Sequence, residues 1–308
     1  MLAGMRVHLS TVACAWILVA CGSGSSPGSP VGIDSGEGVD TGAPASDAGG
    51  GKDATPGNDS AAPDSSPPND ASPGEAGLAS CTGIRYCDGF ESYGGAVNNG
   101  AALGPWKATV MGSTMVVDTV KPHDGAKSLH ITVPAGAGTR ATLNQTVAAG
   151  LVPGNNAFGR AMVFYSNTGG NGLPLAAHSW IFNSAGTSTV AAGNVTMNMG
   201  GGGAKMQLNY HPPAPLPEQS VQGGTMTAGV WHCVQWQYDG SGTPPKDDAK
   251  VWVDGVLAVE APPSKAWNFA TPWSSFDFGF THYQTLANGV EIFLDDFALN
   301  ETMVACPP

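Results

Sequence analysis

From about residue 80 to the C-terminus, short runs of alternating apolar and polar residues are separated by Gly, Pro, Asn and Asp. Alternation with a period of two predicts β-strands with one buried face, and no window here sustains the period of an amphipathic helix. About ten such runs predict an all-β fold, a two-sheet antiparallel β-sandwich of the jelly-roll type. The clearest hairpin is "VWVDGVLAV", in which Asp254-Gly255 is a two-residue turn.

Several runs have one face suited to a core and one face that is polar without being densely charged, as in 139–147, where the polar face carries Arg140 and Asn144. Amide side chains bond sugar hydroxyls, and aromatic rings stack on the C–H face of a sugar, so such a sheet suits a neutral polyol. A solvated outer sheet would show the same pattern, and Arg140 would then pair with a surface acid. The ligand-binding candidates are Asn144, Gln235, Gln237, Gln284 and Tyr210.

The run "FDFGFTHYQT" has a core-like start, with three phenylalanines in 276–280, and a polar end. Strict alternation puts His282 and Gln284 on the phenylalanine side and Tyr283 on the opposite side. If the phenylalanine face is core throughout, Tyr283 reaches the ligand; a bulge near Gly279 would expose His282 and Gln284 instead.

The first 20 residues have the layout of a secretory signal, with Arg6 followed by an apolar run too short to span a bilayer. The ending "LVAC" resembles the bacterial lipobox, which implies cleavage before Cys21 and a lipid on its sulfur. Gly22 at the next position resembles the sorting signal of lipoproteins that are sent to the outer membrane. We therefore expect an exported protein, lipid-anchored to the outer membrane or cell surface.

Residues 21–79 are rich in Gly, Ser, Pro, Ala and Asp and contain no aromatic residue, so they predict a disordered linker. This segment holds nine acidic residues and one lysine, which accounts for most of the chain's net charge of −12. The remaining residues, 80–308, are expected to form one domain, and they contain no basic stripe. We expect a monomer that meets the membrane through its lipid anchor only and has no nucleic-acid partner.

Four cysteines remain in the domain, and an even number in an exported chain predicts two disulfides. Cys81 and Cys306 bracket the domain, which favours Cys81 with Cys306 and Cys87 with Cys233. A local loop between Cys81 and Cys87 is the alternative. The sequence contains no serine elbow, zinc-ligand cluster or nucleotide fingerprint.

Four segments together resemble the secreted β-sandwich of the cellulose-induced protein family: "YCDGFESY", "HDGAKSLHITV", "GVWHCVQWQYDG" followed by "KVWVDG", and "VEIFLDDFALN". That family belongs with the concanavalin A-like folds and is similar to glucuronan and alginate lyases. The resemblance implies a concave cleft that binds plant or microbial polysaccharide. It also implies a structural Ca²⁺ ion, for which the candidate ligands are Glu91, Asp295, Asp296 and Ser128, with Asp124 nearby.

The resemblance to lyases implies an alternative function, cleavage of a uronate-containing glycan by β-elimination. In this reaction a Tyr or His takes the proton next to a carboxylate that Arg, Gln or Asn neutralises. The catalytic candidates are His282 or Tyr283, with Arg140 and His178. The chain departs from the lyase pattern because it has one arginine where a cluster is expected, and His178 precedes an apolar run that also suits a structural histidine.

Overall fold

The computed structural model describes residues 81–136, 138–146, 156–166, 178–202, 204–239, 248–261, 267 and 273–307. The signal peptide (1–20), the lipidated Cys21 and the linker (21–79) that the sequence predicts lie outside the described residues. Within these ranges the chain forms strands and no α-helix, in agreement with the alternating pattern. A helix long and apolar enough to cross a membrane is also not found in them.

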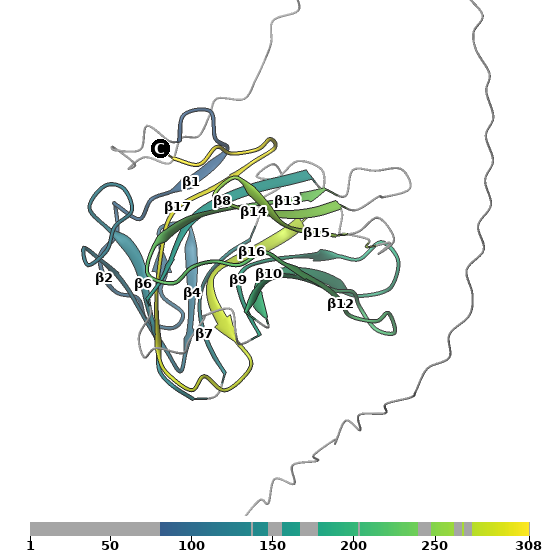
Figure 1. Cartoon of the computed structure of the whole chain (residues 1–308), viewed down its shortest axis with the longest axis horizontal. Coiled ribbons are helices and arrows are strands. Elements are labelled where there is room, and N and C mark those ends of the chain that lie inside the picture. Colours follow the sequence, from purple (N-terminus) through teal and green to yellow (C-terminus); the bar gives the residue numbers. More distant parts are fainter. Residues whose placement is uncertain are drawn as a thin grey trace, which may run out of the picture. The chain divides into compact units, whose positions relative to one another are not determined.

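The described strands form two antiparallel sheets that pack as a sandwich (Figure 1). One sheet has nine strands in the order β15-β14-β13-β8-β17-β6-β5-β2, with β1 paired to β17. Its strands are β1 (Tyr86–Asp88), β2 (Gly95–Ala96), β5 (Thr114–Asp118), β6 (Ser128–Val133), β8 (Asn156–Tyr165), β13 (Trp231–Asp239), β14 (Asp248–Val253), β15 (Val256–Glu260) and β17 (Val290–Asn300). The expected Asp254-Gly255 turn joins β14 to β15.

The other sheet has eight described strands in the order β12-β11-β10-β9-β16-β7-β4-β3. Figure 1 shows that these strands curve, most clearly β16, which runs through the middle of the sheet. The strands are β3 (Ala102–Leu103), β4 (Trp106–Met111), β7 (Thr139–Thr146), β9 (Ser179–Thr187), β10 (Asn194–Gly202), β11 (Lys205–His211), β12 (Gln219–Gly223) and β16 (Trp273–His282).

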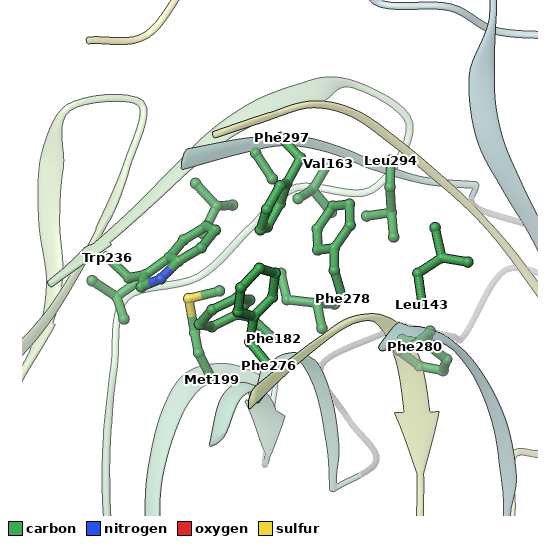
Figure 2. Packing of buried hydrophobic residues seen from close by; sticks show 14 of the residues in the cluster. Leu143, Val163, Phe182, Met199, Trp236, Phe276, Phe278, Phe280, Leu294 and Phe297 are labelled. Atoms are coloured by element: carbon green, nitrogen blue, oxygen red, sulfur yellow. The ribbon is translucent and has the colours of Figure 1, made fainter. Parts of the chain in front are cut away.

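The core lies between the two sheets, where the phenylalanines of β16 meet aromatic residues of the opposite sheet (Figure 2). The rings of Phe278 and Phe297 have centroids 4.5 Å apart, and those of Phe182 and Trp236 are 4.4 Å apart. Each buried ring of this size contributes about 1.5–3 kcal/mol of transfer free energy. Because the alternate residues of β16 are fixed in this core, the residues between them must point to the outer face of the eight-stranded sheet.

The motif "YCDGFESY" has a structural role through Asp88, which is buried. Its carboxylate accepts hydrogen bonds from Trp106 Nε1 (2.5 Å) and from the backbone N–H of Phe90 (2.9 Å). Burial raises the pKa of Asp88 above its ordinary value. The carboxylate thus connects the N-terminal end of the domain to β4.

All four domain cysteines form disulfides, but the favoured pairing is wrong. The bonds join Cys81 to Cys87 and Cys233 to Cys306, with Cα–Cα distances of 5.7 and 5.9 Å. Cys87 lies on β1, and strands β17 and β8 separate β1 from the β13 strand of Cys233. Three strand spacings amount to roughly 14 Å, which no disulfide can span.

Candidate functional site

Five polar side chains form a line across the outer face of the eight-stranded sheet. They occupy directly paired positions on five neighbouring strands: Asn144 pairs with Asp277, Asp277 with Asn183, Asn183 with Asn198, and Asn198 with Asn209. We call these five residues the polar row. Four strand spacings give the polar row a length of roughly 19 Å.

Asp277 is the charged member of the polar row and its hydrogen-bonding centre. Its carboxylate accepts hydrogen bonds from Asn144 Nδ2 (2.9 Å) and from Asn183 Nδ2 (3.0 Å). Arg140 Nη2 lies 3.2 Å from Asp277 Oδ2, so the two charges compensate each other. Because both amide NH₂ groups turn toward Asp277, the Asn183 carbonyl oxygen turns away and is buried without a hydrogen-bond partner among the described residues.

Three ring-bearing residues lie along one side of the polar row, and we call His178, Trp180 and Tyr283 the aromatic corner. Trp180 Nε1 donates to the Tyr283 hydroxyl over 2.6 Å, and the rings of His178 and Tyr283 have centroids 5.4 Å apart. Tyr283 is 56 % exposed, whereas Trp180 is buried. His178 Nε2 lies 2.5 Å from Asn209 Nδ2, which joins the aromatic corner to the polar row.

Two predicted residues reach the aromatic corner from its sides. Arg140 lies over the Trp180 ring, with 5.7 Å from its Cζ atom to the ring centroid. The side-chain carbonyl of Gln284 accepts a hydrogen bond from the backbone N–H of His178 over 3.1 Å. The structure therefore brings Arg140, His178, Tyr283 and Gln284 together beside Asn144, as parts of one surface.

His211 borders the polar row on the side opposite Trp180 of the aromatic corner. Asn198 Nδ2 lies 3.1 Å from His211 Nε2, and His211 Nδ1 lies 3.3 Å from Glu218. Burial lowers the pKa of His211; Glu218 opposes this effect and His178 adds to it. A neutral His211 accepts from Asn198 through Nε2 and donates to Glu218 through Nδ1.

His282 does not line this surface, because the phenylalanine face of β16 is core up to the end of the strand. Its side chain is 1 % exposed and lies beside Phe280, and its Nδ1 is 2.7 Å from the backbone carbonyl of Gln284. An irregularity occurs where β16 pairs with β9, but the pairing with β7 is regular from Ser275 to His282. Of the two alternatives, the structure therefore adopts the one in which Tyr283 reaches the surface and His282 is buried.

Three other expected ligand-binding residues lie elsewhere. Gln235 and Gln237 are on β13 of the opposite sheet, and Gln235 Nε2 donates to the backbone carbonyl of Val304 over 2.6 Å, which fixes the C-terminal segment. Tyr210 faces the core and stacks on Trp267 at a centroid distance of 5.6 Å. Its neighbour Asn209 is the residue of β11 that joins the polar row.

The expected calcium ligands divide into two groups. Asp295 accepts the backbone N–H of His123 (2.9 Å), and Asp296 Oδ2 lies 2.7 Å from His123 Nδ1. Burial and the neighbouring Asp296 raise the pKa of Asp295 to about 8. The other oxygen of Asp296 is buried without a hydrogen-bond partner in the described structure. A pair of buried carboxylates with an unused oxygen has the chemistry of a site for a hard cation.

Glu91 and Ser128 are engaged with other groups. Glu91 Oε1 accepts the backbone N–H groups of Ala126 (2.8 Å) and Lys127 (2.9 Å). The Ser128 hydroxyl donates to the Lys121 carbonyl over 2.8 Å. Across the described ranges, no group of three or more His, Cys, Asp or Glu side chains is arranged to hold a metal ion. Of the expected ligands, Asp295 and Asp296 are the two that lie together as buried carboxylates.

A separate hollow of about 380 Å³ lies on the nine-stranded sheet. It is lined by residues that include Trp231, His123, Asp254 and the disulfide between Cys233 and Cys306. No member of the polar row or the aromatic corner lines it. The hollow and the polar row are therefore distinct features on different sheets.

Sequence reasoning missed four members of the polar row: Asp277, Asn183, Asn198 and Asn209. Each follows an apolar residue directly in its strand, as in "WIFNS", "VTMNM" and "MQLNY". Asn and Asp are depleted in strands, so one in each of several neighbouring apolar runs is a detectable signal. The strand order that aligns them cannot be read from any single run.

Comparisons with known proteins give likenesses of fold at low identity. No protein-family model matches the chain, and no curated protein does. A solved structure of a cellulose induced protein, Cip1, is similar at 17 % identity and a TM-score of 0.49, covering 72 % of this chain and 100 % of that one. An endo-β-1,4-glucuronan lyase from the fungus Trichoderma reesei is similar at 17 % identity and a TM-score of 0.47, covering 66 % and 94 %.

A third similar structure is the globular domain of a T. cruzi calreticulin, at 8 % identity and a TM-score of 0.46, covering 71 % of this chain and 89 % of that one. The first two are the kinds of protein that the sequence motifs resemble. At these values the likenesses concern the fold, and the function has to be argued from the polar row and the aromatic corner.

Proposed function

We propose that the outer face of the eight-stranded sheet binds a polysaccharide. The observation that carries this proposal is the polar row, in which side chains from five neighbouring strands form one hydrogen-bonding line beside the aromatic corner. A line of roughly 19 Å suits an extended polymer better than a compact small molecule. The exposed ring of Tyr283 provides a stacking surface for a sugar beside that line.

The charge of the surface favours hydroxyl groups over carboxylates as ligand groups. Arg140 and Asp277 neutralise each other, and burial favours the uncharged form of His211 by lowering its pKa. The remaining groups are amides, which donate to and accept from hydroxyls. A neutral glycan thus meets a neutral hydrogen-bonding surface, whereas a polyuronate would have to displace Asp277 from Arg140 to gain a charged partner.

Retention on polysaccharides tests this proposal. The intact protein should be held back by at least one member of a panel containing cellulose, glucuronan and alginate, and a soluble oligomer of that glycan should release it. A protein that passes every member of a broad panel of neutral and acidic polysaccharides without delay would rule out the binding function.

A second candidate, a polysaccharide lyase, is favoured by the aromatic corner alone. The Trp180 indole has only a donor, so the Tyr283 oxygen accepts from it and the Tyr283 proton can be exchanged with a ligand. In β-elimination, Tyr283 in its phenolate form would take the proton next to the uronate carboxylate. A carbon–carbon double bond forms, the bond to the glycosidic oxygen breaks, and Tyr283 returns the proton to that oxygen, which regenerates the phenolate. Arg140 would have to leave Asp277 to neutralise the carboxylate.

The lyase candidate predicts new ultraviolet absorbance from unsaturated uronates when the protein is incubated with glucuronan or alginate. Removing a proton-transfer group typically costs about 10²–10⁴-fold in rate, so Tyr283→Phe should abolish the signal. Retention without any absorbance change on every polyuronate would leave binding as the function of this surface.

We propose in addition that Asp295 and Asp296 bind Ca²⁺, which would coordinate the buried oxygen of Asp296 that has no hydrogen-bond partner among the described residues. A cation whose free concentration is about 100 times its Kd adds about 2.7 kcal/mol to the free energy of unfolding. For a domain of this size that corresponds to a rise of about 5–10 °C in melting temperature. Calcium should raise the melting temperature, a chelator should reverse the rise, and Asp296→Asn should remove the response. An identical melting curve with calcium and with chelator would contradict the proposal.

The location that we propose is outside the cytoplasm, with Cys21 as the lipid anchor. Two disulfides in the domain are typical of exported proteins. Metabolic labelling with a fatty acid should mark the intact chain, and Cys21→Ala should remove the label.

A further inference from the structure

The aromatic corner is connected to the edge of the sheet by a chain of three amide side chains. Gln222 Nε2 donates to Gln207 Oε1 over 3.1 Å, and Gln207 Nε2 donates to Asn209 Oδ1 over 2.6 Å. Asn209 Nδ2 then lies 2.5 Å from His178 Nε2. Gln222 is exposed, whereas Gln207 and Asn209 are buried at 9 % and 2 % exposure, so the chain runs from solvent into the site.

The three amides share one polarity, and this decides the role of His178 Nε2. Each of the three amides directs its NH₂ group to the next residue of the chain, and Gln207 and Asn209 accept through their carbonyl oxygens from the residue before. An NH₂ group has no lone pair for a donor, so His178 Nε2 must accept the hydrogen bond from Asn209. A neutral imidazole has one donor and one acceptor nitrogen, which places the ring proton on Nδ1.

Gly202 provides the space in which this chain forms. A Cβ atom at Gly202 would lie 1.8 Å from Gln207 Oε1 and 3.0 Å from Gln222 Nε2. The obstructed group is the far end of a flexible side chain, so an alanine would displace the Gln207 amide rather than the backbone. This one methyl group would therefore break the amide chain without removing any of its hydrogen-bonding groups.

We propose that Asn209 and Gln207 are positioning residues that fix His178 as the Nδ1–H tautomer. His178 then presents only a donor to a ligand, which selects a ligand that offers an oxygen acceptor at that position. His178 is also unable to act as a general base through Nε2, so in the lyase candidate it would be a donor and Tyr283 the proton-accepting group. The role toward a ligand rests on the proposed glycan-binding surface, but the tautomer itself does not.

Long-range ¹H–¹⁵N spectra of the intact, ligand-free protein with ¹⁵N-labelled histidine test the tautomer. At about pH 8, above the ordinary histidine pKa of about 6.5, the signals lost in His178→Gln identify His178. In the wild-type protein the proton should reside on Nδ1. In Asn209→Asp the carboxylate can only accept, so Nε2 should carry a proton instead.

Gly202→Ala gives a second test that leaves Asn209 and His178 unchanged. Displacing Gln207 should release Asn209 and yield a mixture of the two tautomers. Gly94→Ala is the matched control, because a Cβ there would meet nothing within 4 Å, and it should keep the Nδ1–H form. Three results would each overturn the proposal. They are a proton on Nε2 of His178 in the wild-type protein, an unprotonated Nε2 in Asn209→Asp, and a Gly202→Ala spectrum identical to that of the wild type. Because no glycan is present, a failure to bind polysaccharide is a separate result.

Discussion

Replacing Asp277 by alanine should remove most of the polysaccharide affinity. Asn144, Asn183 and Arg140 all direct donors to this carboxylate, so its loss frees three side chains to adopt other rotamers. A hydrogen bond to a charged group contributes about 1.5–3 kcal/mol, and 1.4 kcal/mol is a factor of ten. We expect the Kd for the retained glycan to rise about 10- to 100-fold, measured by isothermal titration calorimetry.

Asp118→Ala is the matched control for this effect. Asp118 lies on β5 of the opposite sheet, where it is 2.8 Å from His130 Nδ1, so its variant also loses a carboxylate paired with a basic residue. Its glycan affinity should equal that of the wild type. Equal affinities of the Asp277→Ala and wild-type proteins, with both folded by melting curve, would mean that the polar row does not bind the glycan.

Removing the disulfide between Cys233 and Cys306 should have the largest effect on stability. The bonded residues are 73 positions apart, so reduction restores much loop entropy to the unfolded chain, worth about 4 kcal/mol. The bond between Cys81 and Cys87 closes a separation of 6 residues and contributes about 2 kcal/mol by the same relation. Denaturant unfolding of the two double-alanine variants should show this order, and a greater loss from the Cys81 and Cys87 variant would contradict it.

Local alternation was sufficient to predict the fold class and the orientation of individual strands. In β7 it placed Ala141 and Leu143 in the core and Arg140 and Asn144 outside, as the structure has them. It also gave the two possible orientations at the end of β16, of which the structure adopts the one that exposes Tyr283. These features depend on residues two positions apart in sequence, so the sequence of a single strand is enough to predict them.

Pairing between distant strands could not be predicted in this way. Gln235 has the same alternating context as Asn144, but its strand belongs to the opposite sheet, where the residue holds the C-terminal segment. The disulfide pairing failed for the same reason, because two strands lie between β1 and β13. The polar row is a property of the strand order, since its five members come from five separate runs.

The most direct test of the proposed binding surface is a map of the glycan contact on the protein. Side-chain NH₂ signals in ¹H–¹⁵N spectra report on asparagine and glutamine individually, so titration with the retained oligosaccharide can follow the polar row itself. We predict shifts at Asn144, Asn183, Asn198 and Asn209, and none at Gln235 or Gln237 on the opposite sheet. Shifts confined to Gln235, Gln237 and the hollow around Trp231, with the polar row unchanged, would contradict the account.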